Sequence, residues 1–302
     1  MTSVTDVAGG PPAIAGGPPA VRPGPPPLRQ PPLGVRLSRL VLPVYTAVAI
    51  IYLLLPIAVM MIFSFNDPRG RQNITWQGFT AENYLSVWER ADITGPMLNS
   101  LLVAVVATLA ATALGTLIGL ALTRYEFAGR GSLNLLLYVP IATPEIILGA
   151  SLLAMWASLG VQRGLGTIVI AHVMFNISFV VITIRARLQG FNRSLEEAAM
   201  DLYANEWMTF RKVTFRLIFP GILAAALLSF ALSIDDFVIT SFVAGQTVTF
   251  PLWVFGASRY GVPPEVNVLG TLIFVVALVF IGLQVWTQRG TILRGRGRPT
   301  QA

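Results

Sequence analysis

Six stretches of the chain are apolar over a length that can cross a lipid bilayer, and they constrain the possible fold more than any other feature. A transmembrane helix needs about 20 predominantly apolar residues. Stretches of this length lie near residues 40–64, 99–122, 133–158, 166–184, 217–243 and 267–286. Charged residues make up only 12% of the chain, whereas they make up about 25% of a soluble domain. The sequence therefore predicts an all-α integral membrane protein with six transmembrane helices.

Two of these stretches contain residues that are unusual inside a membrane. The third holds Pro140, Pro144 and Glu145, and because proline frees backbone carbonyls, this stretch is predicted to be broken or partly re-entrant. Glu145 then either lines a solute pathway or caps the broken helix. The fifth holds Asp235 and Asp236. An ionised carboxylate inside a span costs about 2.5 to 3.5 kcal/mol on insertion scales, so it is expected to face water, a partner or a solute.

The distribution of arginine and lysine predicts the orientation in the membrane. Sixteen of these residues lie in the N-terminal tail, the 123–132 and 185–216 loops and the C-terminal tail, whereas five lie in the loops between them. Cytoplasmic segments carry the excess of basic residues. We therefore expect a multi-pass protein of the plasma or inner membrane with both termini in the cytoplasm.

The ends of the chain differ in composition from its middle. Residues 1–36 are rich in proline and glycine and contain no apolar stretch, which predicts a disordered cytoplasmic tail. This tail lacks the ordered basic, apolar and small-residue parts of a secretory signal, so we expect it to stay attached. Residues 37–288 then form the transmembrane domain, and residues 289–302 a basic cytoplasmic tail.

The 185–216 loop predicts a short amphipathic helix in the cytoplasm. Ser194 and Glu197 have the spacing of a capping box, in which each side chain bonds a backbone donor of the first turn. A narrow apolar face follows at helical spacing in Leu195, Ala198, Ala199 and Leu202. Such a face needs a partner, which is either the bundle of the same chain or a second protein.

This loop resembles the EAA loop of ABC importer permeases. The resemblance lies in Glu197-Ala198-Ala199 and Asp201-Leu202, followed by Trp207, Phe210, Arg211, Lys212, Val213, Pro220 and Gly221. In that family the loop forms a coupling helix, between transmembrane helices 4 and 5, that sits in a groove of the cytoplasmic ATPase. The resemblance thus implies an ATPase-coupling role for Ser194, Leu195, Glu197, Ala198, Ala199, Asp201, Leu202 and Tyr203.

Other segments are similar to the spermidine/putrescine branch of the same family. They are Ser64-Phe65-Asn66, Thr75-Trp76-Gln77-Gly78-Phe79-Thr80, Leu122-Thr123-Arg124-Tyr125, Ser233-Ile234-Asp235-Asp236, Gly261-Val262 and Pro264-Glu265-Val266-Asn267. The resemblance implies a pathway for a small cationic solute, a polyamine; related permeases carry other small organic solutes, which is the alternative. It also implies two ATPase subunits, a second permease and an extracytoplasmic solute-binding protein as partners.

Two positions depart from the family pattern. Tyr203 stands where the family usually has glycine, and Arg216 where it usually has proline. Because tyrosine resists the positive φ that glycine permits, either the turn after the coupling helix differs, or Tyr203 fills a matching hollow in its own ATPase.

The chain carries no motif for chemistry of its own. It has no P-loop, since its one lysine, Lys212, follows Arg211 rather than glycine. ATP and magnesium are therefore expected to bind the partner ATPase, and no cofactor is expected to bind this chain. With no cysteine and one histidine, His172, no metal site is predicted. We expect no nucleic-acid partner and no enzymatic activity. The alternative classes are an ion-coupled secondary transporter, which would show internal repeats, and a membrane scaffold.

The acidic pair of the fifth stretch predicts the solute pathway. On a continuous helix Asp236 would share one polar stripe with Ser229, Ser233 and Thr240, whereas Asp235 would point about 100° away. We therefore assign Asp236 to the solute, unless another helix or the second permease supplies its partner, and Asp235 to a structural bond or a helix break. Glu145 is a further pathway candidate.

Two polar residues of the fourth stretch predict contact between helices. His172 and Asn176 share one helix face, so they bond a neighbouring helix or, alternatively, the solute.

Overall fold

A computed structural model describes residues 33–70 and 72–295, and within these ranges every extended regular element is a helix. Of the predicted tails, at residues 1–36 and 289–302, residues 1–32 and 296–302 lie outside the described residues, whereas residues 33–36 and 289–295 are helical. The helices are α1 (Leu33–Phe63), α2 (Asn83–Ser86), α3 (Ala91–Arg124), α4 (Arg130–Ala142), α5 (Glu145–Ser158), α6 (Leu165–Gln189), α7 (Ser194–Asp201), α8 (Glu206–Thr209), the π-helix η1 (Phe210–Thr214), α9 (Phe215–Ile234), α10 (Val238–Val243), α11 (Phe250–Ala257) and α12 (Pro264–Gly295).

The chain forms two compact units that divide after Leu54, and the helical bundle belongs to the second. In the first unit, the described side chains of α1 from Val41 onward are apolar except for Thr46, whose hydroxyl bonds the Leu42 carbonyl, and nearly all are exposed. A helix that is apolar all round is typical of a membrane span.

Four helical segments of the described residues are long and apolar enough to cross a membrane, or five if a bent pair counts as one span. The four are Val41–Phe63, Ala91–Arg124, Leu165–Gln189 and Glu206–Ile234, and the pair is α4 with α5. The last predicted stretch falls in α12, whose searched apolar part, Pro264–Val279, is shorter. The prediction of a multi-span helical protein is confirmed, and the number six stays a prediction.

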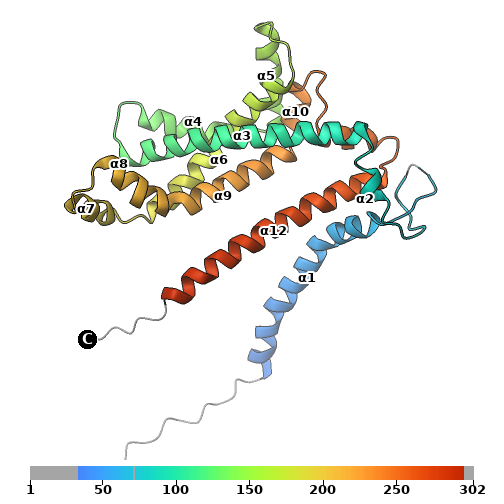
Figure 1. Ribbon diagram of the computed structural model, residues 1–302, viewed down its shortest axis with the longest axis horizontal. Helices are drawn as coiled ribbons and strands as arrows, with labels where there is room; N and C mark the ends of the chain where they lie inside the picture. Colours follow the sequence, from blue (N-terminus) through green and yellow to red (C-terminus); the bar gives the residue numbers. More distant parts are fainter. Residues whose placement is uncertain (1–32, 71, 296–302) are drawn as a thin grey trace, which may run out of the picture. The chain divides into compact units, whose positions relative to one another are not determined.

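The core of the second unit is a bundle of α3, α6 and α9, which run side by side (Figure 1). Small residues let the backbones approach: a Cβ on Gly115 would lie 2.6 Å from Val180 Cγ1, and one on Gly221 would lie 2.8 Å from Arg187 Cγ. Close contact between small residues is how helices associate in lipid, where apolar burial gives no driving force. The same surface buries Ala104, Ala107 and Ala111 of α3.

The third stretch is broken, as its prolines predict. α4 ends at Ala142, α5 starts at Glu145, and their axes differ by 107°. The break follows from Pro144, which cannot continue the hydrogen-bond ladder of a helix. α5 then packs on α10, where a Cβ on Gly149 would lie 2.5 Å from Phe242 Cδ2.

The predicted continuous helix through the fifth stretch is wrong. α9 ends at Ile234, and α10 starts at Val238. An aspartate side chain offers the backbone an alternative to the helical ladder, and the carboxylate of Asp236 accepts the Thr240 backbone N–H at 2.8 Å. The prediction that Asp235 marks a helix break is confirmed, since it is the C-terminal cap of α9.

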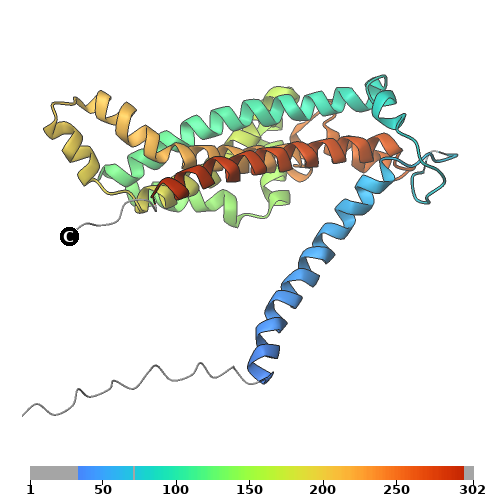
Figure 2. The same cartoon turned by 60° about the horizontal axis from the view of Figure 1, so that its bottom comes forward.

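The two ends of the bundle carry different structures. α7 and α8 lie at the end opposite α2 (Figure 2). At the α2 end, the loop after α1 is ordered by asparagines: Asn83 Nδ2 donates to the carbonyls of Ser64 and Asn66 at 3.0 and 2.8 Å. The loop that resembles the EAA segment and the loops with few basic residues are therefore at opposite ends.

Candidate solute pathway and coupling site

A buried polar network joins α6 to the break between α9 and α10. His172 of α6 is 3% exposed, and its Nδ1 lies 2.6 Å from Ser233 Oγ. Its Nε2 lies 2.9 Å from Thr240 Oγ1 and 3.2 Å from Asp236 Oδ2. One turn along α6, Asn176 Nδ2 donates to the Ser229 carbonyl at 3.4 Å. The prediction that His172 and Asn176 bond a neighbouring helix is confirmed.

Asp236 has its hydrogen bonds inside the protein. Its carboxylate accepts the Thr240 hydroxyl at 2.6 Å and the backbone N–H of Ile239 at 3.4 Å, besides the contacts with His172 and the Thr240 backbone. These bonds explain why a carboxylate with 10% exposure is tolerated there, because a buried charge must be paired and hydrogen-bonded. The structure thus brings Asp236, Ser233 and Thr240 together, but around His172 instead of along one helix face.

The other predicted pathway residues lie outside this network. Ser229 is buried, and its hydroxyl has no hydrogen-bond partner among the described residues. Asp235 is exposed and makes no ion pair within the described part of the chain. Glu145 is exposed in the first turn of α5, where a negative charge favours the helix dipole. Both interpretations of Glu145 stay predictions.

The predicted capping box of α7 is wrong. The helix does start at Ser194, but no side chain caps its N-terminus. Instead, the Ser194 backbone N–H donates to Asn192 Oδ1 at 3.1 Å, so the asparagine two residues earlier competes for the start of the helix. The Ser194 backbone thus bonds the residue two positions earlier, and the Ser194 side chain does not cap the helix.

The apolar residues of α7 and the turn after it face outward. Helix α7 ends at Asp201 and Leu202 is its C-terminal cap, so the helix ends one residue before the last residue of the predicted apolar face. No residue of α7 is buried, and Leu195 and Leu202 are 48% and 81% exposed. Met200 and Trp207 are also exposed, with 46% and 69%. Several exposed large apolar residues in one short segment are typical of a protein interface.

The turn after α7 keeps a glycine-like conformation although it has no glycine. Tyr203 has φ +63°, a left-handed value that costs a residue with a Cβ atom about 1 to 2 kcal/mol. The turn is closed by a bond from the Ala204 backbone N–H to the Ala199 carbonyl at 3.1 Å. The Tyr203 side chain is 99% exposed. Of the two alternatives for Tyr203, a turn without the left-handed conformation is not observed, and a role for the side chain in docking stays a prediction.

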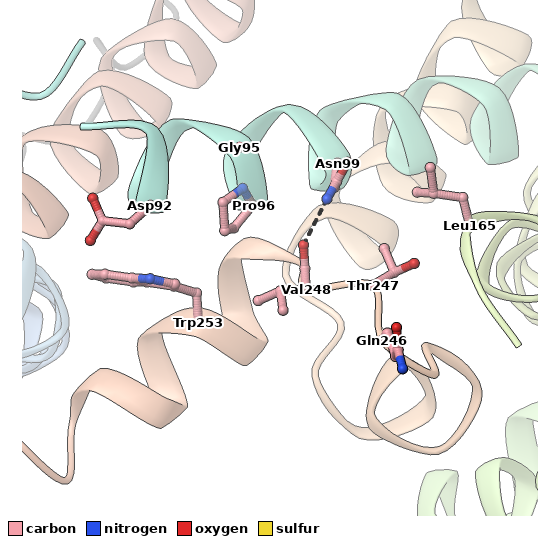
Figure 3. A pocket seen from close by; sticks show the side chains of 9 residues that line it. All are labelled: Asp92, Gly95, Pro96, Asn99, Leu165, Gln246, Thr247, Val248 and Trp253. Carbon is pink, nitrogen blue, oxygen red and sulfur yellow. Dashed lines mark hydrogen bonds between the residues drawn. The ribbon is translucent and has the colours of Figure 1, made fainter. Parts of the chain in front are cut away.

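A shallow cleft of about 530 Å³ lies at the other end of the bundle, between the start of α3 and the loop before α11 (Figure 3). The Asp92 carboxylate and the Trp253 indole face each other at one side of the cleft, and Asn99 Nδ2 donates to the Val248 carbonyl at 2.9 Å across it. The cleft is lined by Asp92, Gly95, Pro96, Asn99, Leu165, Gln246, Thr247, Val248 and Trp253.

Arg90 joins two acidic residues beside this cleft. It contacts Asp92 at 2.9 Å and Glu265, at the start of α12, at 3.2 Å. Hydrogen bonds with Asp92 and Glu265 raise the pKa of the Arg90 guanidinium, so the arginine stays charged and ties α3 to α12 at this end. Arg90 was not predicted from the sequence to be a structural residue, although it lies between an aromatic loop and the start of a helix, where such a contact can form.

Comparison with known proteins places the chain in a family. The family described as binding-protein-dependent transport system inner membrane component matches residues 111–289. The spermidine/putrescine transport system permease protein PotC of Escherichia coli strain K12 is 38% identical over 231 residues, which cover 76% of this chain and 87% of that protein. The putrescine transport system permease protein PotI of the same strain is 36% identical over 243 residues, covering 78% and 85%.

A solved structure agrees with this placement at the level of the fold. A bacterial ABC transporter that imports the acidic polysaccharide alginate superposes with a TM-score of 0.62 at 17% identity, covering 86% of this chain and 98% of that one. The helical bundle, the family match and the two permease relatives lead to one conclusion. The chain belongs to the family of binding-protein-dependent transport system inner membrane components, the permeases of ABC importers.

Proposed function

We propose that the chain is a permease subunit of an ATP-driven importer and forms part of the pathway for a polyamine such as putrescine or spermidine. The observation that carries this proposal is the 38% identity, over 76% of the chain, to a permease named for spermidine and putrescine. The acidic residues at the break between α9 and α10 support a cationic solute, because a carboxylate attracts an ammonium group strongly where water is scarce.

The proposed topology has six spans with both termini in the cytoplasm. It rests on the six apolar stretches and on the sixteen basic residues of one face against five of the other. In this arrangement α7 is the cytoplasmic coupling helix, and the cleft beside Asp92 faces outward, toward an extracytoplasmic solute-binding protein.

The proposed partners follow from the surface of α7. The exposed apolar residues Leu195, Met200 and Leu202 need a protein surface to cover them. A cytoplasmic ATPase dimer is that partner in our proposal, with ATP and magnesium bound by the ATPase. A second permease subunit completes the pathway across the lipid bilayer.

The pathway residues divide into an exposed and a buried carboxylate. Asp235 is exposed, whereas Asp236 is held by His172 and Thr240. We propose that the solute passes this acidic pair and that Ser229, Ser233 and Thr240 lie behind it. Glu145 is the third acidic candidate, at the start of the helix that packs on α10.

Uptake of labelled putrescine and spermidine by the assembled complex tests the function. We expect wild-type uptake of at least one polyamine and a fall of about ten-fold or more in Asp235→Asn and Asp236→Asn, at unchanged amounts of protein and bound ATPase. Ser241→Ala, at an exposed serine of α10, is the matched control. Absence of polyamine uptake by the intact complex contradicts the substrate, and uptake of another small organic solute would then identify the alternative.

Single cysteines test the topology, because the natural chain has no cysteine to react in the background. We expect Asn73→Cys to react with an impermeant thiol reagent in intact cells and Ser194→Cys to react only after the cells are opened. Labelling of Ser194→Cys from outside would reverse the proposed orientation.

A further inference from the structure

Three side chains from three different elements meet beneath α7. Arg124 is the last residue of α3, Glu196 lies in the first turn of α7, and Thr214 is the last residue of η1. Arg124 Nη2 and the Thr214 hydroxyl both donate to Glu196 Oε1, and Arg124 Nη2 lies 3.5 Å from Thr214 Oγ1. We call these three residues the Arg124 cluster.

The acidic partner of the cluster is less exposed to water than the acidic partner of the nearby ion pair between Arg130 and Glu126. The side chains of Arg124 and Glu196 are 28% and 15% exposed, and Thr214 is 0% exposed. The pair between Arg130 and Glu126, by contrast, spans 3.6 Å and leaves Glu126 93% exposed. A pair held away from solvent is screened less and depends more on both partners than an exposed pair does.

Neighbouring glutamates of α7 therefore have different surroundings. Glu196 is bonded within the cluster, whereas Glu197 is exposed and makes no ion pair among the described residues, although it lines the same cleft as Glu196. Successive residues of a helix point about 100° apart, so one acid of α7 is used inside the subunit and the next is free for a partner. The resemblance to the EAA loop concerns Glu197 and leaves Glu196 without a role.

The cluster is a main attachment of α7 to the membrane helices. No residue of α7 is buried, and α7 packs only on the short elements α8 and η1 among its stronger neighbours. Arg124, however, ends α3, which packs along both α6 and α9, and Thr214 leads directly into α9. Movement of α7 is thus connected through Glu196 to the two helices at the centre of the bundle.

We infer that the Arg124 cluster transmits displacement of α7 to α3 and α9, so that Arg124 and Glu196 are positioning residues for coupling and do not themselves bind the ATPase. This inference rests on the proposed function, in which α7 is the coupling helix. The pair of Arg124 and Glu196 resists movement of α7 away from α3 or along it, because either movement leaves a partly buried charge without its partner. In this inference the apolar residues of α7 bind the ATPase, and the Arg124 cluster transmits the displacement of α7 to α3 and α9.

The test uses the assembled complex of ATPase, both permeases and solute-binding protein in proteoliposomes. We expect Arg124→Gln to retain normal amounts of bound ATPase and normal basal ATP hydrolysis. Uptake per complex should fall about ten-fold, in the range of typical coupling between sites. The number of ATP molecules hydrolysed per solute should rise accordingly, which a loss of folded complex would not produce.

Two further variants separate a specific pair from general damage. The exchange Arg124→Glu with Glu196→Arg restores opposite charges and should recover at least half of the uptake, whereas Glu196→Arg alone should not. Arg130→Gln, which breaks the exposed pair with Glu126, is the matched control and should behave as the wild type. If Arg124→Gln does not accumulate in the membrane, Thr214→Val provides the test, because it removes only the hydroxyl from the cluster.

A fluorescent probe on Ser241→Cys, in the otherwise cysteine-free chain, gives a readout that needs no solute. We expect ATP with vanadate to change the probe signal in the wild type and not in Arg124→Gln. An unchanged ratio of hydrolysis to uptake in Arg124→Gln, no recovery in the exchange variant, or no probe response in the wild type overturns the inference. A complex that binds the ATPase and responds at Ser241 but takes up no polyamine refutes the proposed function alone.

Discussion

Two regions of the molecule contrast in which groups they bury. The network between α6, α9 and α10 buries polar groups, whereas α7 and the turn after it expose apolar ones. In the network, His172, Ser233 and Thr240 are buried and bonded to one another. On α7 and the turn after it, Leu202 and Tyr203 are exposed to the surroundings. Polar groups turn inward where lipid surrounds the helix, whereas apolar groups turned outward at a bundle end indicate a missing protein partner. The side chains of His172, Ser233 and Thr240 find their partners within one chain, whereas nothing among the described residues covers Leu202 and Tyr203.

A charge placed on α7 should have the largest effect in this comparison. Ala198 is exposed on α7, and in Ala198→Arg docking would bury an unpaired charge at a cost of about 4 kcal/mol. We expect the ATPase to be lost on co-purification and uptake to cease. Ala198→Ser is the control that keeps a small side chain. Retention of the ATPase together with continued uptake would place docking elsewhere.

Removal of the imidazole should have a smaller effect, confined to stability. His172→Leu leaves Asp236 and Ser233 without their shared partner, at a cost of about 2 kcal/mol in the free energy of unfolding. Denaturant unfolding of the purified subunit measures the loss.

His172→Gln is the matched variant, because its amide can still bond Asp236 or Ser233. We expect it to lose less stability than His172→Leu and to retain ATPase binding. Equal losses in the two variants would show that packing, rather than hydrogen bonding, holds this network.

Release of the left-handed backbone at Tyr203 should have the smallest effect. Tyr203→Gly relieves the positive φ, and after the larger entropy of glycine in the unfolded chain is subtracted, we expect a local gain of about 0.5 kcal/mol. Hydrogen exchange at the Ala204 amide, which closes the turn, should slow about two-fold.

Tyr203→Ala keeps a Cβ atom and also removes the ring, so it serves as the control. It should leave hydrogen exchange at Ala204 unchanged. A gain of the same size in Tyr203→Ala would assign the effect to the ring instead of the backbone.

The sequence predicted features that depend on local chemistry. The apolar stretches indicated long membrane helices, and Pro144 indicated the break between α4 and α5, because proline acts on its own segment wherever it occurs. The helical pairing of His172 with Asn176 was also visible, since residues four apart share a helix face.

Features that depend on distant partners were not predicted. The helical spacing of Ser229, Ser233 and Thr240 favoured one continuous helix. The structure instead ends α9 at Ile234 and places Ser233 and Thr240, but not Ser229, against His172, which precedes them by 61 and 68 positions. Glu196 was similarly absent from the predicted site, because its partner Arg124 is separated from it by two membrane segments. Ser194 starts α7 without capping it, and its backbone N–H bonds Asn192 Oδ1, a competing bond that spacing alone does not predict.

The bend between α4 and α5 limits where lipid can touch this subunit. Thr143 and Pro144 lie outside both helices, and the axes turn by 107° there. The Thr143 N–H still donates to the Val139 carbonyl at 2.9 Å, but Pro144 has no N–H to give the Pro140 carbonyl the partner that a straight span provides. Hydrocarbon cannot hydrate a carbonyl, and irregular backbone at membrane depth persists only against protein or water. Lipid therefore cannot contact the subunit at this corner. The backbone there must be covered by another polypeptide or face a water-filled cavity.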